Sequence, residues 1–558
     1  MRSPLQIRTE LASAMQKALA EKFQEDIPDV EILPSRNLSF GDLACNSAMP
    51  LAGKLKRSPR DIAAVMADSV SSGFSQVEKV SIDGPGFLNI TLSGEYLAEF
   101  TVAVASGGIG QFIPSQGTGK TALVEFVSSN PTGPLTVGHC RQAVLGDAVS
   151  RLLEAAGWTV QREYYFNDAG RQMDKLAESL AVRYMGLLGV SMDIPEGGYQ
   201  GGYIKEWAGE LRKDKGDLLK WPDEKDLFRE YAGEKAFVLI SDDLKLLGIT
   251  FDRFFAESEL IPDAVEEAIG LLRRKELVYE DSDDPRKIWL KLSEMDRPED
   301  RVIMREDGTY TYRMPDIAYH LNKFRRGYDL VVDIFGSDHI DTCKDVEAVL
   351  GELLGKDDVS SRLRTILHQF VTLVRGGEKV KMSTRAGNYV TLREMISEVG
   401  SANVVRYIFL TRRAEAHMDF DLEAAVAENE DNPVFYVQYA FARIAGILRK
   451  TTDPESLVVR DPGRLISILT GERERDLMRL METVPLRISA AASALEPHRI
   501  PDILAEIARA FHGFYQHHRV VDPDNDETTA ARLTLCIAVR STLSDLLKIL
   551  GVHAPEKM

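Results

Sequence analysis

The stretch SSNPTGPLTVGHCRQAVLGD, residues 128–147, follows a short apolar segment, TALVEFV (121–127), and runs into a segment with helical periodicity. The apolar segment predicts a buried strand, and Leu145, Val149 and Leu152 recur at the spacing of one helix face. A strand, a loop rich in proline and glycine and a helix, in this order, are typical of a doubly wound parallel sheet. Such sheets bind ligands at the carboxyl ends of their strands, next to helix N-termini.

Later segments repeat this pattern. Further strand candidates, each followed by polar or helical sequence, are TVQREYYF (159–166), DLVVDIF (329–335) and TILHQFVTLV (365–374). The alternation predicts an α/β Rossmann-type domain with a doubly wound parallel sheet over residues 116–400. The charged stretch from about 190 to 295 is predicted to be an insertion between the two halves of the sheet.

The N-terminal region, residues 1–107, is predicted to be an α+β domain. Its first residues form an amphipathic helix pattern with apolar positions at every fourth residue, namely Ile7, Leu11, Met15 and Leu19. Alternating apolar residues on both sides of the turn Gly84-Pro85-Gly86 predict two strands joined by that turn. The glycine-rich stretch 106–119 predicts a flexible linker.

The C-terminal region, residues 401–558, has few strand signals. Apolar residues recur at helical spacing over 503–514 and again over 533–550. One helix face is marked by Ile503, Ile507, Phe511 and Phe514. These patterns predict an all-α bundle.

Composition limits the class of protein. A chain of 558 residues is too long for one hydrophobic core, and 44% hydrophobic with 28% charged residues is typical of a folded protein. The net charge of -18 argues against non-specific coating of nucleic acid, but it allows a selective RNA binder with its cations on one face. Without a long apolar run, a leader or closely spaced cysteines, the sequence predicts a cytoplasmic protein with free thiols, no membrane segment and no metal site.

A second segment carries positive donors. GGEKVKMSTRAGNYVTL, residues 376–392, places Lys379, Lys381 and Ser383 between glycines, after the last strand candidate. Such donors on a loop stabilise charge on a phosphate that leaves during a reaction. By itself the segment would be interpreted as a basic surface loop, but its position after the 128–147 motif favours a catalytic role.

Together these motifs resemble class I aminoacyl-tRNA synthetases, and most closely the arginyl-tRNA synthetases. The family sequence N-P-T-G-P-L-x-V-G-H matches residues 130–139, and its K-M-S loop matches 381–383 in the form K-M-S-T-R. One position departs from the signature H-x-G-H, because Thr136 stands where the first His is found. Similar segments are FNDAGRQ (166–172) and GSDHIDT (336–342), and the resemblance extends to the N-terminal and C-terminal regions.

The resemblance implies a role for each matching position. The residues implied in catalysis are Thr136, His139, Lys379, Lys381 and Ser383. The residues implied in ATP binding are Pro134, Gly138, His139, Gly336, Asp338, His339 and Met382. Arginine binding is implied for Glu125 and Asn130 at the backbone amine and for Tyr312 and Asp316 at the guanidinium. A guanidinium needs carboxylates for paired hydrogen bonds. tRNA binding is implied for Tyr436, Gln438, Tyr439 and Arg443.

We therefore expect an enzyme that activates L-arginine with ATP and Mg²⁺ and transfers it to tRNA(Arg), without a tightly bound cofactor and as a monomer. The family commonly needs bound tRNA for the activation step. Alternatives remain open at this stage: a synthetase-derived RNA-binding protein without catalysis, which Thr136 would suit, or an enzyme for another amino acid. Asp316 also suits the cap of a helix beginning near Ile317. Tyr439 and Arg443 also suit a core helix with one exposed Arg.

Overall fold

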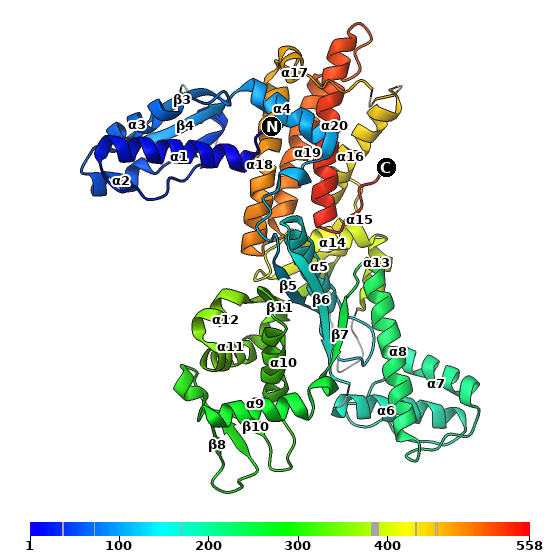
Figure 1. Cartoon of the computed structure of the whole chain (residues 1–558). Helices are drawn as coiled ribbons and strands as arrows, with labels where there is room; N and C mark the ends of the chain where they lie inside the picture. Colours follow the sequence, from blue (N-terminus) through cyan, green and yellow to red (C-terminus); the bar gives the residue numbers. More distant parts are fainter. Residues whose placement is uncertain are drawn as a thin grey trace. The chain divides into compact units, whose positions relative to one another are not determined.

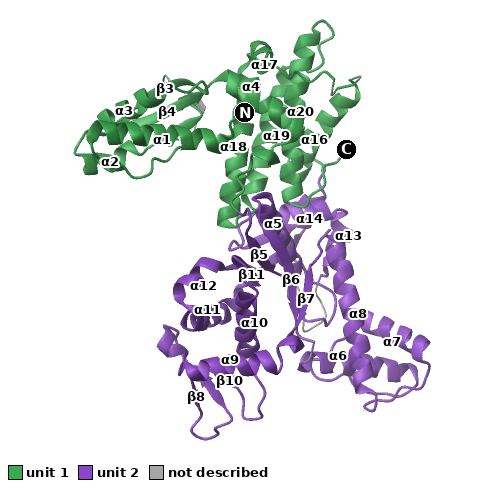
Figure 2. Cartoon of the chain, viewed as in Figure 1, with its two compact units in different colours: residues 1–116, 428–558 green, residues 117–427 purple. Residues whose placement is uncertain are grey.

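The structure is a computed structural model of the whole chain. The residues it describes are 1–35, 38–71, 73–168, 170–380, 390–429, 432–451, 453–454 and 456–558. They form two compact units, one made of residues 1–116 and 428–558 and the other of residues 117–427 (Figure 2). The predicted division into three domains at 107, 116 and 400 stays a prediction.

The second unit is built around a parallel sheet. Its strands, in spatial order, are β12 (Leu363–His368), β11 (Leu330–Gly336), β5 (Thr121–Glu125), β6 (Thr159–Phe166) and β7 (Arg253–Ala256). Every neighbouring pair is parallel, which confirms the predicted fold class. Because β6 lies on one side of β5 and β11 on the other, the strand order reverses between β5 and β11, where ligands of such sheets bind.

Two details of this sheet differ from the prediction. Strand β7 comes from the middle of the stretch expected to be an insertion, yet it forms an edge of the main sheet. The segment 365–374, predicted as one strand, is divided between β12 and β13 (Val371–Arg375). At the break, Gln369 N donates to Ala414 O at 2.9 Å instead of continuing the ladder. Apolar residues on both sides of the break conceal it in the sequence.

Strand β13 belongs to a smaller sheet with β14 (Glu378–Lys379) and β15 (Met418–Asp421). An antiparallel sheet is formed by β8 (Val278–Glu280), β9 (Ile288–Leu290) and β10 (Arg301–Met304). The helices of this unit are α5 (Val137–Ala155), α6 (Arg171–Leu187), α7 (Gly202–Lys215), α8 (Lys225–Leu246), α9 (Asp263–Arg274), α10 (Arg313–Arg325), α11 (Ile340–Leu354), α12 (Lys356–Arg362), α13 (Leu392–Val399), α14 (Ala402–Leu410) and α15 (Leu422–Val426). Figure 1 shows α6 and α7 beside α8, where they bury their own apolar core around Tyr184, Trp207 and Phe228.

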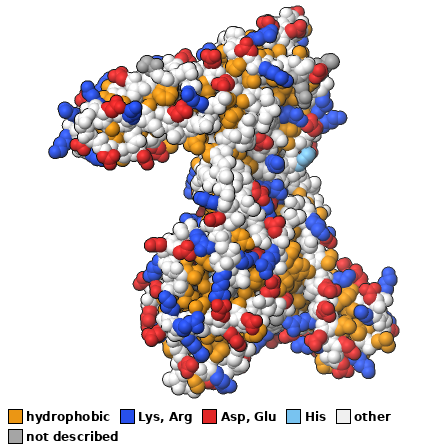
Figure 3. Space-filling view, in the orientation of Figure 1, with side chains coloured by type: hydrophobic (Ala, Val, Ile, Leu, Met, Phe, Trp, Pro, Cys, Tyr) orange, Lys and Arg blue, Asp and Glu red, His pale blue; other side chains and the backbone are white. Residues whose placement is uncertain are grey.

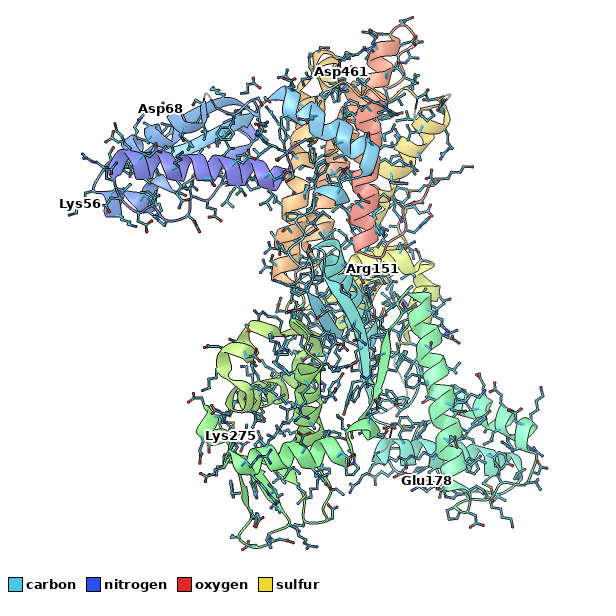
Figure 4. All side chains as sticks on the ribbon, viewed as in Figure 1. Lys56, Asp68, Arg151, Glu178, Lys275 and Asp461 are labelled. Atoms are coloured by element: carbon cyan, nitrogen blue, oxygen red, sulfur yellow. The ribbon has the colours of Figure 1, made fainter. Side chains whose placement is uncertain are left out.

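Most residues of helix α5 are buried. It packs against β5, β6 and β11, and Gly157 follows its end in the left-handed region with φ 89°. Asp147 on this helix accepts a hydrogen bond from Arg151 Nε at 2.7 Å and pairs with the buried Arg406 of α14. Arg151 is labelled in Figure 4. These contacts fix the helix whose N-terminus carries the 128–147 motif.

The first unit contains the two ends of the chain. Its N-terminal part has α1 (Pro4–Phe23), α2 (Ala48–Leu55), α3 (Pro59–Ser71) and a sheet of β1 (Leu33–Pro34), β2 (Leu43–Cys45), β4 (Phe87–Leu92) and β3 (Val77–Asp83). The predicted N-terminal helix is confirmed, with Ile7, Leu11, Met15 and Leu19 all buried. The predicted hairpin is confirmed as well, since Asp83 pairs with Phe87 across the turn.

The rest of this unit is helical, as predicted. It contains α4 (Gly94–Gly107), α16 (Pro433–Arg449), α17 (Pro462–Ile468), α18 (Glu472–Ala494), α19 (Arg499–His517) and α20 (Asp526–Ile549). The stretch expected to be a flexible linker is instead anchored, because Ile109 N and Gly110 N both donate to the Asp545 carboxylate at 3.1 Å. Glycine content could not reveal an acceptor so distant in the sequence.

Charged side chains of both signs are intermingled over the face shown in Figure 3. This distribution agrees with the mixed composition of the chain. In the described part of the chain, no helix has the length and apolar character that crossing a membrane requires.

We predict that Gly146→Ala destabilises the protein, although replacing glycine by alanine inside a helix normally stabilises that helix by about 1 kcal/mol. A Cβ at Gly146 would overlap the ring of Phe126, and overpacking of this kind costs about 1–3 kcal/mol. Gly209→Ala in α7 is the matched control, because a Cβ there meets nothing within 4 Å and should be neutral or stabilising. Thermal unfolding of both variants checks this, and equal melting temperatures would contradict the packing argument.

Candidate active site

A cavity of about 750 Å³ opens at the carboxyl ends of β5, β6, β11 and β12, beside the point where the strand order reverses. Residues from the separate sequence motifs meet on its walls. The sequence-predicted residues that line it are Glu125, Asn130, Pro134, Thr136, Gly138, His139, Tyr312, Asp316, Gly336, Asp338 and His339. The structure therefore brings together most of the residues predicted for arginine and ATP, and their roles stay predictions.

Some predicted residues lie elsewhere. Lys379 is exposed on β14 and is not among the described residues that line the cavity. Lys381, Met382 and Ser383 lie outside the described residues. Their predicted roles therefore rest on the sequence alone.

The N-terminus of α5 forms one wall of the cavity. Thr136 is the N-cap, and its backbone N–H donates to His139 Nδ1 at 3.2 Å. Because Nδ1 accepts this bond, the proton of the neutral ring is on Nε2. Burial, with a smaller effect of His368, lowers the pKa of His139 to about 4, so the ring is neutral at pH 7. This wall thus offers an uncharged N–H donor beside the positive end of a helix, which suits phosphate oxygens.

A buried group of charges lies beneath the opposite wall. Glu125 ends β5 and is the register partner of Asp333 on β11. Lys323 of α10 is fully buried between them, donating to Asp333 Oδ1 at 2.6 Å and to Glu125 Oε2. Burial raises the pKa of Glu125, whereas for Asp333 the effect of burial is outweighed by Lys323 and His320, which lower its pKa. One cation therefore holds two strand ends together at the switch point.

His320, one turn before Lys323, extends this network. Its Nε2 lies 2.9 Å from Asp333 Oδ2, and its Nδ1 lies 2.7 Å from the carbonyl oxygen of Asp316. The first turn of α10 is thereby fixed relative to β11. The interpretation of Asp316 as a helix cap is wrong, because α10 begins at Arg313 with Tyr312 as its N-cap. The helix starts earlier than its apolar pattern indicates, so Asp316 lies inside its first turn.

The cavity has an acidic side. Glu257 follows β7 and accepts hydrogen bonds from Tyr165 Oη and Asn167 Nδ2, both at 2.7 Å. Burial raises the pKa of Glu257. Burial, together with the charges of Glu125 and Glu257 and against the opposing effect of His320, raises the pKa of Asp316 to about 7. Carboxylates that disfavour one another's charge in this way form a site for a cation with several donors.

Asn130 links this acidic side to the 128–147 motif. Its Oδ1 accepts from Asn167 N at 3.0 Å, and its Nδ2 donates to Gln172 Oε1 at 2.6 Å. The neighbouring Asp168 accepts from Ser258 N at 3.1 Å. The segment 166–172 therefore connects the motif loop to the turn that carries Glu257.

Sequence reasoning missed Glu257, Lys323 and His368. Glu257 was overlooked because it follows β7, whose stretch was interpreted as an insertion. Lys323 and Asp333 each interrupt an apolar helix face or strand, and a buried charge in such a pattern was the available signal. His368 was hidden inside the segment interpreted as one continuous strand.

Contacts outside the cavity join the two signature regions. The backbone N–H of Leu392, the last residue of the 376–392 segment, donates to Leu135 O at 2.8 Å. The buried Asp243 of α8 accepts from Leu135 N at 3.2 Å and from Arg393 Nη2 at 2.9 Å. The described chain thus positions residue 392 directly beside the loop that precedes α5.

Among the described residues no group of His, Cys, Asp or Glu side chains is arranged to hold a metal ion. The acidic side of the cavity is already hydrogen-bonded by Tyr165 and Asn167.

The predicted tRNA-binding residues lie on α16 in the first unit. The Arg443 guanidinium lies 4.5 Å from the ring centre of Tyr439 and 4.8 Å from that of Tyr515. Tyr436 lies 4.7 Å from the ring of His512, and Gln438 Nε2 donates to His553 O at 3.0 Å. The helix also buries an apolar face that includes Val437, Phe441 and Ile444. It therefore serves both as a core helix and as the carrier of an aromatic and basic cluster.

Comparison with protein families covers most of the chain. Residues 109–409 match the family described as tRNA synthetases class I (R), catalytic domain. Residues 5–92 match the arginyl tRNA synthetase N terminal domain, and residues 437–558 match the DALR anticodon binding domain.

Individual proteins are similar over nearly their full length. The chain is 41% identical to an arginine--tRNA ligase of Thermotoga maritima, covering 99% of both chains. It is also 41% identical to an arginine--tRNA ligase of Desulfotalea psychrophila, covering 93% of both. A solved structure titled as a putative arginyl-tRNA synthetase from Campylobacter jejuni superposes with a TM-score of 0.76 at 32% identity, covering 84% of this chain and 100% of that one.

We predict that Lys323→Met strongly destabilises the second unit. Removing this cation leaves Glu125 and Asp333 buried without their partner, and breaking a buried pair costs about 3–5 kcal/mol. Lys245→Met is the matched control, because Lys245 pairs with Asp242 at the surface, where such pairs contribute about 0–1 kcal/mol. Calorimetric unfolding measures both variants. A Lys323→Met variant as stable as the control would show that the buried network does not hold the strands.

Proposed function

The chain belongs to the arginyl-tRNA synthetases of class I, and on this basis we propose that it joins L-arginine to tRNA(Arg) through an arginyl-adenylate, with ATP as the second substrate. The single observation that carries the proposal is the two-sided cavity. One side is acidic, with Glu125, Glu257 and Asp316, and the other is the N-terminus of α5 with His139. An arginine cation fits the first side and a triphosphate fits the second.

Arginine is held by charge and hydrogen bonds. Glu257 and Asp316 accept from the guanidinium, whose fixed fork of donors matches carboxylate oxygens. Tyr312, the N-cap of the helix that carries Asp316, lines this side of the pocket. Glu125 and Asn130 take the α-ammonium end, nearer to the motif loop. The resulting orientation directs the arginine carboxylate toward the N-terminus of α5.

The first step joins arginine to AMP. An oxygen of the arginine carboxylate attacks the α-phosphorus of ATP, a new O–P bond forms, and the bond to pyrophosphate breaks. Charge grows on the phosphate oxygens, where the His139 Nε2–H and the end of α5 stabilise it. Mg²⁺ enters with ATP and neutralises part of the triphosphate charge. The sequence assigns Lys381 and Ser383 to the leaving pyrophosphate.

The second step transfers arginine to tRNA. A ribose hydroxyl of the terminal adenosine attacks the carbonyl carbon of the adenylate, AMP leaves, and the hydroxyl proton is released. Neither step requires a protein nucleophile, so catalysis consists of positioning and electrostatic stabilisation. Selection of tRNA is assigned to the cluster around Tyr439 and Arg443, whose rings and guanidinium suit stacking on unpaired bases and contact with phosphates.

Aminoacylation of total tRNA by the purified protein, with labelled arginine, ATP and magnesium, tests the proposal. We expect charging with arginine and none with lysine or cysteine, because a shorter cation or a thiol cannot bridge the carboxylates. Charging with another amino acid, or tRNA binding without charging, would overturn the proposed function.

We predict that Glu257→Gln raises KM for arginine by about 10- to 100-fold, as expected for loss of a charged hydrogen bond worth about 1.5–3 kcal/mol. The matched control is Glu259→Gln in the same turn, since Glu259 pairs with Arg253 at 2.7 Å and lies outside the cavity lining. Pyrophosphate exchange in the presence of tRNA measures KM for arginine in both variants. If the two variants behaved alike, Glu257 would have no part in binding arginine.

Arginine binding should depend on pH near neutrality. With its pKa raised to about 7, Asp316 is partly protonated in the free enzyme, and a bound cation lowers that pKa. Affinity for arginine is therefore constant well above pH 7 and falls about tenfold per pH unit below it, because binding must displace the proton. Calorimetric titration in buffers of different ionisation enthalpy should detect the released proton.

Asp316→Asn should abolish this dependence and the proton release. Asp341→Asn is the control, because Asp341 is 74% exposed and its loss changes the charge equally. Proton release that persisted in Asp316→Asn would assign the titration to another group.

A further inference from the structure

His368 has no role in the account above, although it lines the same cavity. It is the last residue of β12, and the register of the parallel sheet pairs it directly with Gly336, the last residue of β11. Its side chain therefore emerges at the carboxyl edge of the sheet, beside the turn that carries Asp338 and His339. Both of these residues, with Gly336, are among those for which the family resemblance implies ATP binding.

The imidazole of His368 is only 8% exposed, and its two nitrogens differ. Nδ1 lies 3.3 Å from the carbonyl oxygen of Gln369, which can only accept a hydrogen bond, so Nδ1 carries the proton. Nε2 is buried and has no hydrogen-bond partner among the described residues. A buried polar atom without a partner costs about 1–3 kcal/mol, and such an atom in a cavity wall indicates a ligand that satisfies it.

The charge state of the ring identifies the kind of ligand group. Burial is the main cause that lowers the pKa of His368 to about 4, so the ring is neutral at pH 7. A neutral ring with its proton on Nδ1 presents a lone pair at Nε2. This atom accepts from an N–H or O–H and cannot donate to a phosphate oxygen. Its place beside Gly336 and Asp338, away from the acidic side of the cavity, assigns it to the nucleoside.

We propose that His368 Nε2 accepts a hydrogen bond from the adenosine of ATP, and so helps the enzyme to select this nucleotide. The donor is the exocyclic amine of adenine or a hydroxyl of the ribose, which share this chemistry. The inference rests on the proposed use of ATP. His368 is a binding residue in this account, so its loss should raise KM for ATP while kcat and KM for arginine change little.

The test combines substitutions with nucleotide analogues. Calorimetric titration measures the affinity of the whole protein for the magnesium complexes of ATP, 2′-deoxy-ATP, 3′-deoxy-ATP and purine riboside triphosphate, which lacks the 6-amine. His368→Leu should weaken ATP binding about tenfold. The wild-type protein should bind one analogue, the one that lacks the bonded group, about tenfold more weakly than ATP. His368→Leu should not change the affinity for that analogue. It should weaken the binding of the two other analogues as much as that of ATP, so the analogue that is unaffected identifies the donor.

Controls separate binding from folding. His417→Leu replaces a histidine that is 56% exposed in the same unit and should bind all four nucleotides like the wild type. His368→Gln keeps a hydrogen-bond acceptor and should retain part of the preference for ATP over the analogue that lacks the donor. It replaces His368→Leu in the test if that variant does not fold. KM for ATP and for arginine in tRNA-dependent pyrophosphate exchange gives a second reading.

Three results would overturn the inference. In the first, His368→Leu binds ATP as tightly as the wild type. In the second, it weakens ATP and all analogues equally, which would indicate a structural effect. In the third, the wild-type protein binds every analogue like ATP. Because binding needs no turnover, these outcomes are independent of whether the protein charges arginine, and failure of charging with normal nucleotide discrimination would count against the proposed function alone.

Discussion

The ion pairs of Lys323 with Glu125 and Asp333 are the interaction on which the site depends. They lie where the strand order of the sheet reverses, so they join β5 to β11 at the place where a ligand must bind. A single cation between two buried carboxylates leaves a negative balance beneath the acidic side. Burial raises the pKa of Glu125 and of Asp316, so it disfavours the charged form of both carboxyl groups. A bound cation would favour the charged form of these carboxyl groups, which is the basis of the proposed binding of arginine.

The opposite wall works by a different principle. His139 is neutral, and its Nδ1 accepts a hydrogen bond from the backbone N–H of Thr136. The geometry of the helix N-terminus therefore determines that Nε2 carries the proton and acts as the donor. The end of α5 supplies the remaining positive potential. Thr136 thus orients His139 with its main-chain N–H, and its hydroxyl lies at the same distance of 3.2 Å from Nδ1. A threonine side chain at this position is compatible with a preorganised donor.

Much of this arrangement could be predicted from the sequence, because it follows from local patterns. The strand, loop and helix around residues 121–155 and the hairpin at Gly84-Pro85-Gly86 have short-range signals that the structure confirms. The break at Gln369, the place of β7 and the anchoring of Ile109 by Asp545 could not be predicted, since each depends on partners distant in the chain. The same reason explains why Glu257 was missed: it lies close to Asn167 and Asp316 only in the folded chain, and no motif surrounds it in the sequence.

The negative net charge of the chain is compatible with an RNA substrate. Non-specific affinity for nucleic acid grows with the number of phosphates that cations neutralise, so an acidic chain reduces binding to the wrong RNA. Contacts then have to come from a few well-placed groups. The cluster of Tyr439, Arg443 and Tyr515 has this character, with a guanidinium held between two rings instead of a broad basic surface. Stacking needs no surplus charge. In the proposed function, selection of tRNA therefore depends on a few placed aromatic and charged groups and not on a broad basic surface.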